Sequence, residues 1–135
     1  MTLQPPIPVL RIFDARLARQ FYVDWLAFRV DWESETGSDG PRYLQISRGP
    51  VILHLTEHYG DCSPWAKVFI NTDDVEALHR ELATRPNPNM RPGVEVAPWN
   101  AKVMEVIDPF GNRLCFSQPL GRPLGPSPGR TGCSS

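Results

Sequence analysis

The sequence lacks several features that would each assign its 135 residues to a functional class. No apolar run approaches the ~20 residues needed to cross a bilayer, and no basic-then-apolar secretory signal opens the chain. Fourteen Lys and Arg face fifteen Asp and Glu, so the basic excess of a nucleic-acid binder is missing. The three cysteines form no CxxC pair, which removes support for a zinc knuckle or redox pair. We expect a reduced, cytoplasmic protein that binds neither nucleic acid nor membrane.

Proline is abundant, and its positions separate a folded domain from an appendage. Residues 117–135 hold four of the fifteen prolines and four glycines, with no aromatic residue beyond Phe116. Such a segment buries too little apolar surface to offset the entropy of ordering it. We therefore expect one domain over residues 1–118 and a flexible tail over residues 119–135. A PxxP ligand in the tail is the less favoured alternative.

Residues 5–60 carry the pattern of a first module. Asp14 is placed to cap a helix whose apolar side chains recur at three- and four-residue steps. The expected elements are a strand at 8–13, a helix at 15–28, an acidic turn-rich loop at 31–40, and strands at 42–47 and 51–56.

Residues 65–118 repeat this order as a second module. The expected elements are a strand at 67–71, a helix from Asp73 or Asp74 to about Thr84, a Pro-broken stretch at 85–98, and strands at 102–107 and 113–116 around a turn at 108–112. A shift of about sixty residues lays Asp14 on Asp74 and His54 on Cys115. A duplicated α+β fold follows, with two βαβββ modules curling a mixed sheet around a concave cleft.

One five-residue segment has the spacing of a metalloprotease motif. His54 to His58 reads HLTEH, the H-x-x-E-H spacing that requires a helix to align both histidines. The preceding residues, Val51 to Leu53, favour a strand, on which His54 and His58 lie more than ~12 Å apart. We therefore reject the zinc-protease interpretation.

The chain carries an ordered set of motifs: a strand ending in Asp14, a helix with Phe21-Tyr22, the Leu26-Ala27-Phe28 string, the VILHLT strand at 51–56 and the DPFGN turn at 108–112. This set resembles the vicinal oxygen chelate superfamily, which includes glyoxalases, bleomycin resistance proteins and dioxygenases. It covers residues 7–117. Ala27 replaces the usual Gly of the family, which implies a shifted or tightened turn after the helix.

The resemblance implies four strand positions at which enzymes of the superfamily hold a divalent metal. They fall on Ile7, His54, Lys67 and Cys115. Ile cannot ligate a metal and a protonated Lys repels one, which leaves two ligands where catalytic zinc has three. We therefore expect no metal and no other cofactor, and a non-enzymatic binding protein. His54 is then either a polar contact in the cleft or a residue satisfied by backbone.

The metal-free branch that the chain resembles is the bleomycin-resistance type, whose members sequester a flat cationic glycopeptide at a homodimer interface. The Pro8-Val9-Leu10 strand and Pro98-Trp99 carry this resemblance, and the Pro5-Pro6 arm would permit strand exchange between subunits. We expect a homodimer with a small-molecule ligand such as a bleomycin-type antibiotic. The candidate ligand-binding residues are Asp31, Trp32, Glu33, His54, Trp65, Trp99 and Phe110. For Trp25, on the apolar helix stripe, a core position is expected.

Two alternatives remain open. The first is a metal-dependent lyase, isomerase or dioxygenase of the same superfamily, with its site drawn from His54, Glu57, His58 or Glu105. The second is a scaffold whose cleft is filled by side chains and which acts through protein contacts.

Overall fold

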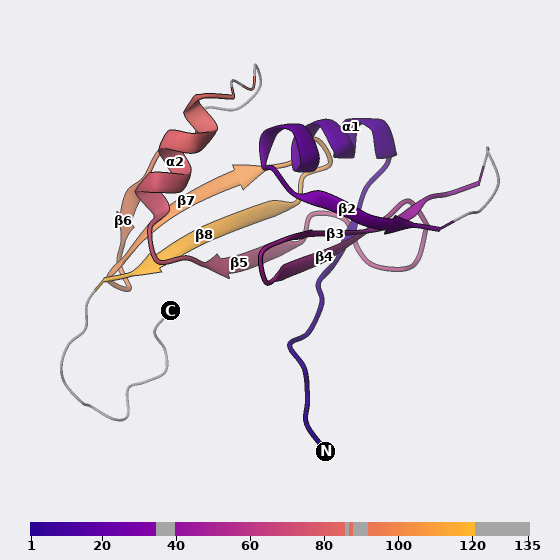
Figure 1. The fold of residues 1–135 in the computed structure, drawn as a ribbon, viewed down its shortest axis with the longest axis horizontal. Coiled ribbons are helices and arrows are strands. Elements are labelled where there is room, and N and C mark those ends of the chain that lie inside the picture. The colour runs from indigo at the N-terminus through magenta and orange to yellow at the C-terminus, as the bar shows by residue number, and fades with distance from the viewer. Residues whose placement is uncertain (35–39, 86, 88–91, 121–135) are drawn as a thin grey trace. The chain divides into compact units, whose positions relative to one another are not determined.

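A computed structural model describes residues 1–34, 40–85, 87 and 92–120, and the chain divides into two units (Figure 1). Unit 1 contains residues 1–66 together with the turn at 107–112. Unit 2 contains residues 67–106 and the chain from Arg113 onward. No helix in the described residues is long and apolar enough to cross a membrane.

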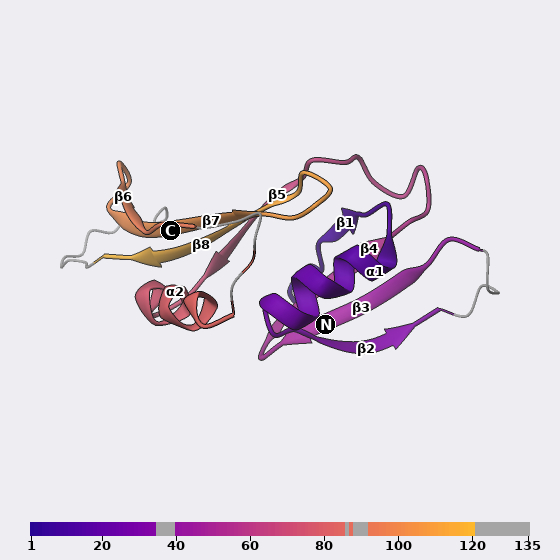
Figure 2. The ribbon, with the colours of Figure 1, turned by 90° about the horizontal axis from the view of Figure 1, so that it is seen from above.

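Unit 1 is a four-stranded sheet, sheet A, with one helical segment. Its elements are β1 (Val9–Arg11), α1 (Ala15–Arg19), η1 (Gln20–Trp25), β2 (Arg29–Glu33), β3 (Tyr43–Arg48) and β4 (Val51–Thr56). The strand order is β1-β4-β3-β2, in which β1 is parallel to β4 and the other pairs are antiparallel. Figure 2 shows α1 lying over this sheet. Alternate strand side chains and one helix face form the core, which includes Tyr22, Trp25, Leu44, Ile46, Leu53 and Leu55.

The helical segment begins as predicted and ends earlier than predicted. The Asp14 carboxylate accepts hydrogen bonds from the backbone N–H groups of Arg16 and Leu17, so Asp14 is the expected N-cap. After Arg19 the helix widens to a π-helical turn, in which Leu26 N–H donates to Phe21 C=O. Ala27 then adopts φ +62°, in the left-handed region. A helix reaching Phe28 is therefore wrong, because a left-handed residue ends it.

Unit 2 repeats the same topology as sheet B. Its elements are β5 (Lys67–Asn71), α2 (Val75–Ala83), β6 (Glu95–Ala97), β7 (Ala101–Ile107) and β8 (Arg113–Pro119). The order β5-β8-β7-β6, with β5 parallel to β8, matches that of sheet A element for element. Asp74 caps α2 by accepting from the N–H of Ala77. The duplicated βαβββ pattern is thus confirmed.

Several strands differ from the expectation, and β1 (Val9–Arg11) is shorter than the predicted strand at 8–13. Strand β2 occupies part of the segment predicted as an acidic loop, and β6 lies in the Pro-broken stretch. Both strands are short, and their pairing with β3 and β7 holds them extended where the local sequence signal is weak. Strand β8 continues to Pro119. The predicted tail lies outside the described residues from 121 onward.

Candidate functional site

The open face of sheet A, turned away from α1, carries the candidate site. Side chains alternate along a strand, so the buried Leu44 and Ile46 of β3 face the core while Tyr43 and Gln45 face outward. On β4, His54 is the register partner of Gln45 and points to the same side. Strand alternation thus brings Tyr43, Gln45 and His54 together on one surface.

A β-bulge in β2 adds Trp32 to this surface. Val30 pairs with Ile46, whereas Trp32 pairs with Gln45, so Asp31 is the extra residue. Regular pairing would have placed Trp32 opposite Leu44 and toward the core. The bulge instead turns the indole to the open face, where it is 45% exposed.

The aromatic rings on this face pack in an ordered way. Trp32 stacks parallel to Tyr43, with ring centroids 6.0 Å apart and planes within 6°. The His54 imidazole meets both rings edge-on, at 5.5 Å from Trp32 and 5.2 Å from Tyr43. Packing on one side holds the Trp32 ring while nearly half of its surface stays in solvent. Such a held aromatic face suits stacking on a planar or cationic molecule.

A chain of hydrogen bonds behind the rings sets the tautomer of His54. The carboxylate of Asp31 can only accept, so Gln45 Nε2 must donate to Asp31 Oδ2 at 3.1 Å. Gln45 Oε1 then faces His54 Nε2 at 2.9 Å, and that ring nitrogen must carry the proton. In the neutral ring, Nδ1 accepts from the Tyr43 hydroxyl at 2.8 Å.

The electrostatics of the face favour a neutral imidazole. Burial lowers the pKa of His54 and raises the pKa of Tyr43, and nearby Asp61 and Cys62 raise the latter further. Tyr43 therefore remains a hydroxyl, and His54 is uncharged at neutral pH. The surface offers a neutral, aromatic, hydrogen-bonding patch.

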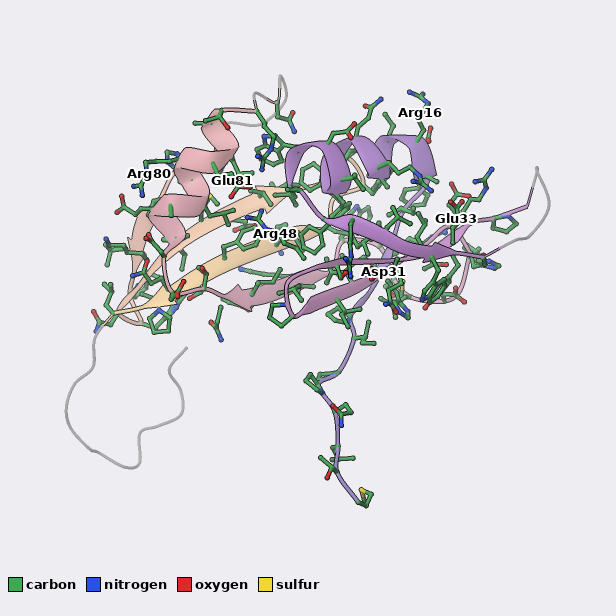
Figure 3. All side chains as sticks on the ribbon, in the orientation of Figure 1. Arg16, Asp31, Glu33, Arg48, Arg80 and Glu81 are labelled. Carbon is green, nitrogen blue, oxygen red and sulfur yellow. The ribbon has the colours of Figure 1, made fainter. Side chains whose placement is uncertain are left out.

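The two acidic candidates on β2 are engaged with neighbouring side chains. Asp31 Oδ1 accepts from Ser47 Oγ and from Arg29 Nε, each at 3.0 Å. The hydrogen bond from Gln45, followed by those from Ser47 and Arg29, lowers the pKa of Asp31. Glu33, which lies further along β2 than Asp31 (Figure 3), forms ion pairs with both Arg19 and Arg42. Arginine therefore balances both carboxylates. Glu35 and Asp39, the other acidic residues of the predicted rim, lie outside the described residues.

The turn at 108–112 is structural, as predicted from its Pro and Gly. The buried Asp108 carboxylate accepts from Tyr22 Oη at 2.7 Å, from the N–H groups of Phe110 and Asn112, and from Asn112 Nδ2. Burial raises the pKa of Asp108, and these donors oppose the rise. Gly111 adopts φ +90°. The turn is thereby fastened to η1 within unit 1.

Two other candidates belong to this turn or contact it. Phe110 is buried and packs against Phe13, with centroids 5.9 Å apart. Trp65 is 72% exposed. Its backbone adopts a left-handed φ of +66°. Its indole lies against Gly111, where any Cβ would overlap it. Trp25 is buried in the core, as expected.

The residues at the metal positions of the superfamily do not form a fitting donor set. His54 has both ring nitrogens hydrogen-bonded. Glu57, from the HLTEH string, caps α1 by accepting from Ala15 N–H and also accepts from Arg42 N–H. In unit 2, burial raises the pKa of the Cys115 thiol, which disfavours the thiolate that binds metal. Among the described residues, no group of three His, Cys, Asp or Glu side chains could hold a metal ion.

Comparison with known proteins identifies the family of this chain. A profile of glyoxalase superfamily proteins matches residues 1–121. The chain belongs to the glyoxalase superfamily. No curated protein matches the sequence.

Several solved structures share the fold. A bleomycin-binding protein complexed with bleomycin is 20% identical, with a TM-score of 0.69 over 86% of this chain and 98% of that chain. The bleomycin-binding protein from bleomycin-producing Streptomyces verticillus, complexed with copper(II)-bleomycin, is 26% identical, with a TM-score of 0.65 over 87% and 98%. A bleomycin resistance determinant encoded on the transposon Tn5 is 20% identical, with a TM-score of 0.67 over 87% and 98%.

Sequence reasoning missed Tyr43, Gln45 and Ser47 as partners in the site. Each lies on the polar face of a strand that was correctly predicted, and His54 was already a candidate on the neighbouring strand. The signal that would have found them is period-two alternation combined with the register of the hairpin at 42–56.

Proposed function

We propose that this protein binds a planar or cationic small molecule of the bleomycin type on the open face of sheet A, without a metal. The observation that carries the proposal is the half-exposed Trp32 ring, stacked on Tyr43 beside a hydrogen-bonded His54. Bleomycin-binding proteins among the structural neighbours support it. Both ring nitrogens of His54 are engaged, because Nε2–H donates to Gln45 and Nδ1 accepts from Tyr43, and this supports metal independence.

The direct test is calorimetric titration of the full chain with copper(II)-bleomycin. We expect saturable binding that Trp32→Ala weakens about tenfold, since aromatic stacking contributes ~1.5 kcal/mol. Trp32→Phe keeps a ring and should retain most of the affinity. The matched control is Tyr59→Ala, which removes a 94%-exposed aromatic of unit 1 outside the hydrogen-bond chain. An absence of binding, or equal losses in Trp32→Ala and Tyr59→Ala, would refute the proposal.

A second measurement separates sequestration from catalysis. Bleomycin incubated with the protein should be recovered unchanged by chromatography, and the purified protein should hold less than stoichiometric metal. Stoichiometric Zn²⁺, Ni²⁺, Mn²⁺ or Fe²⁺, or conversion of the ligand, would favour the lyase, isomerase or dioxygenase alternative instead.

We further propose that the protein is a homodimer. The N-terminal arm at residues 1–7 forms no strand and extends away from sheet A (Figure 1), with Met1 and Leu3 exposed to solvent. A second copy would cover this apolar arm. Sedimentation equilibrium should give a dimer that Leu3→Glu weakens and the neighbouring Thr2→Glu does not. A monomeric wild-type protein would refute dimerisation.

A further inference from the structure

The hydrogen-bond chain on the open face of sheet A begins at a charge. Asp31 Oδ2 faces Gln45 Nε2 at 3.1 Å, and Gln45 Oε1 faces His54 Nε2 at 2.9 Å. His54 Nδ1 faces the Tyr43 hydroxyl at 2.8 Å. An amide, an imidazole and a hydroxyl can each donate or accept, whereas a carboxylate can only accept. The carboxylate is therefore the one member of the chain that can fix its direction.

The Asp31 carboxylate is held in its charged form and in one orientation. The hydrogen bonds from Gln45, Ser47 and Arg29 lower its pKa. Its Oδ1 accepts from Ser47 Oγ and from Arg29 Nε, each at 3.0 Å, which leaves Oδ2 turned to Gln45. Asp31 is therefore an acceptor at neutral pH, and each following link must donate toward it.

This direction reaches the other end of the chain at Tyr43. Because Gln45 Oε1 accepts the Nε2 proton of His54, Nδ1 of the neutral ring is an acceptor, and the Tyr43 hydroxyl donates to it. Within the part of the chain that the structure describes, the Tyr43 oxygen has no other hydrogen-bond partner. The oxygen of this half-buried residue therefore offers only lone pairs to a ligand.

We propose that Asp31 is a specificity-determining residue of the site on sheet A, which selects ligands that place a hydrogen-bond donor at Tyr43. The donor would be an amide N–H, an amine or an ammonium. Asp31 acts through Gln45 and His54 and does not touch the ligand. A ligand carbonyl or carboxylate at the same place would face an oxygen that has no proton to give, and would lose its hydrogen bond to water without replacement. This selectivity rests on the proposed function for the place of the ligand, and adds the polarity of the group that the ligand carries.

Asp31→Asn should reverse the chain. Two donors face Oδ1, so the amide oxygen of the variant should take that position and its amide nitrogen the position of Oδ2. The Gln45 amide would then turn over, His54 would carry its proton on Nδ1, and the Tyr43 hydroxyl would donate to the ligand. Long-range proton–nitrogen correlation NMR spectra show which ring nitrogen of His54 is protonated. In weakly alkaline buffer, we expect Nε2 in the wild-type protein and Nδ1 in the variant.

Two planar probes, indole and quinoline, measure the selectivity in the same buffer, in which both are uncharged. Indole offers an N–H donor, and the quinoline nitrogen can only accept. Tyr43→Phe keeps the ring and removes the oxygen, so its ratio of affinities for the two probes is the baseline. In amide shift titrations of the full chain, we expect the wild-type protein to favour indole about fivefold over this baseline, the ratio typical of one net hydrogen bond. Asp31→Asn should favour quinoline over the same baseline.

The matched control is Asp24→Asn. Asp24 is an exposed acid of η1, so the variant removes the same charge from unit 1 outside the hydrogen-bond chain. The tautomer of His54 and the preference for indole should both survive this change.

Four results would overturn the proposal: a proton on Nδ1 of His54 in the wild-type protein, an unchanged tautomer in Asp31→Asn, equal changes of preference in Asp31→Asn and Asp24→Asn, or a wild-type protein in which neither probe shifts the amides of sheet A. Titration with copper(II)-bleomycin decides the proposed function separately. If the antibiotic does not bind while the tautomer and the preference are as expected, the bleomycin-type ligand is wrong and the selectivity for donors stands.

Discussion

Ala27 stores backbone strain that a single substitution should release. Its φ of +62° lies in the left-handed region, which costs a residue with a Cβ about 1–2 kcal/mol. The side chain is exposed, so Ala27→Gly loses no packing. Glycine adopts this φ without a steric cost. It also raises the conformational entropy of the unfolded chain, which lowers the free energy of unfolding by about 0.5–1 kcal/mol. The net expectation is a gain of roughly 0.5–1 kcal/mol in the free energy of unfolding.

Thermal and urea unfolding would measure this gain. A chain of this length should show a rise in Tm of about 2–4 °C, with no change in the urea m-value. Ala83→Gly is the matched control, because Ala83 is also exposed but lies in the last turn of α2. There the same substitution should lower stability by up to about 1 kcal/mol. If Ala27→Gly is neutral or destabilising, the strain argument is wrong.

Three further substitutions probe unit 1. Tyr22→Phe removes a buried hydrogen bond to the Asp108 carboxylate and should lower the unfolding free energy by about 1.5–3 kcal/mol in urea titrations; an unchanged midpoint would contradict this. Burial lowers the pKa of His54 from 6.5, so the neutral imidazole is favoured in the folded state. The contribution of His54 to the free energy of unfolding is therefore complete above pH 6.5 and is lost as the pH falls through the folded-state pKa. Stability should thus fall on acidification, and less steeply in His54→Gln. Gly111→Ala should cost about 1–3 kcal/mol, and less in a Trp65→Ala background where the overlapping indole is gone.

The duplication has placed different chemistry on two equivalent sheets. In unit 1, the open face carries a neutral imidazole held by Tyr43 and Gln45. In unit 2, the shift of about sixty residues puts Cys115 at the equivalent strand position, beside Lys67 and Phe69. Because the backbone of each module is stabilised by its own core, the solvent-side residues of its strands can change with little effect on the fold.

Local sequence signals were sufficient for most of the fold. Asp14 was identified as a cap, and Asp73 or Asp74 as the second, because an acidic side chain before an apolar helical stripe has a short-range hydrogen-bonding role; the structure selects Asp74. The strand at Lys67–Asn71 was predicted residue for residue. The turn at 108–112 was read from Pro and Gly, whose backbone preferences are intrinsic. The β2 strand was missed, since its polar residues are held extended by β3.

Caps, turns and periodicity act over a few residues, so the sequence alone was enough to predict the duplication, the order of the main elements and the place of His54 on a strand. The side chains that surround His54 could be identified only in the folded chain. The bulge at Asp31 turns Trp32 from the core side to the open side, and cross-strand register then places Tyr43 and Gln45 against the imidazole. These contacts join residues on three strands, and such pairing depends on long-range register that no local pattern encodes.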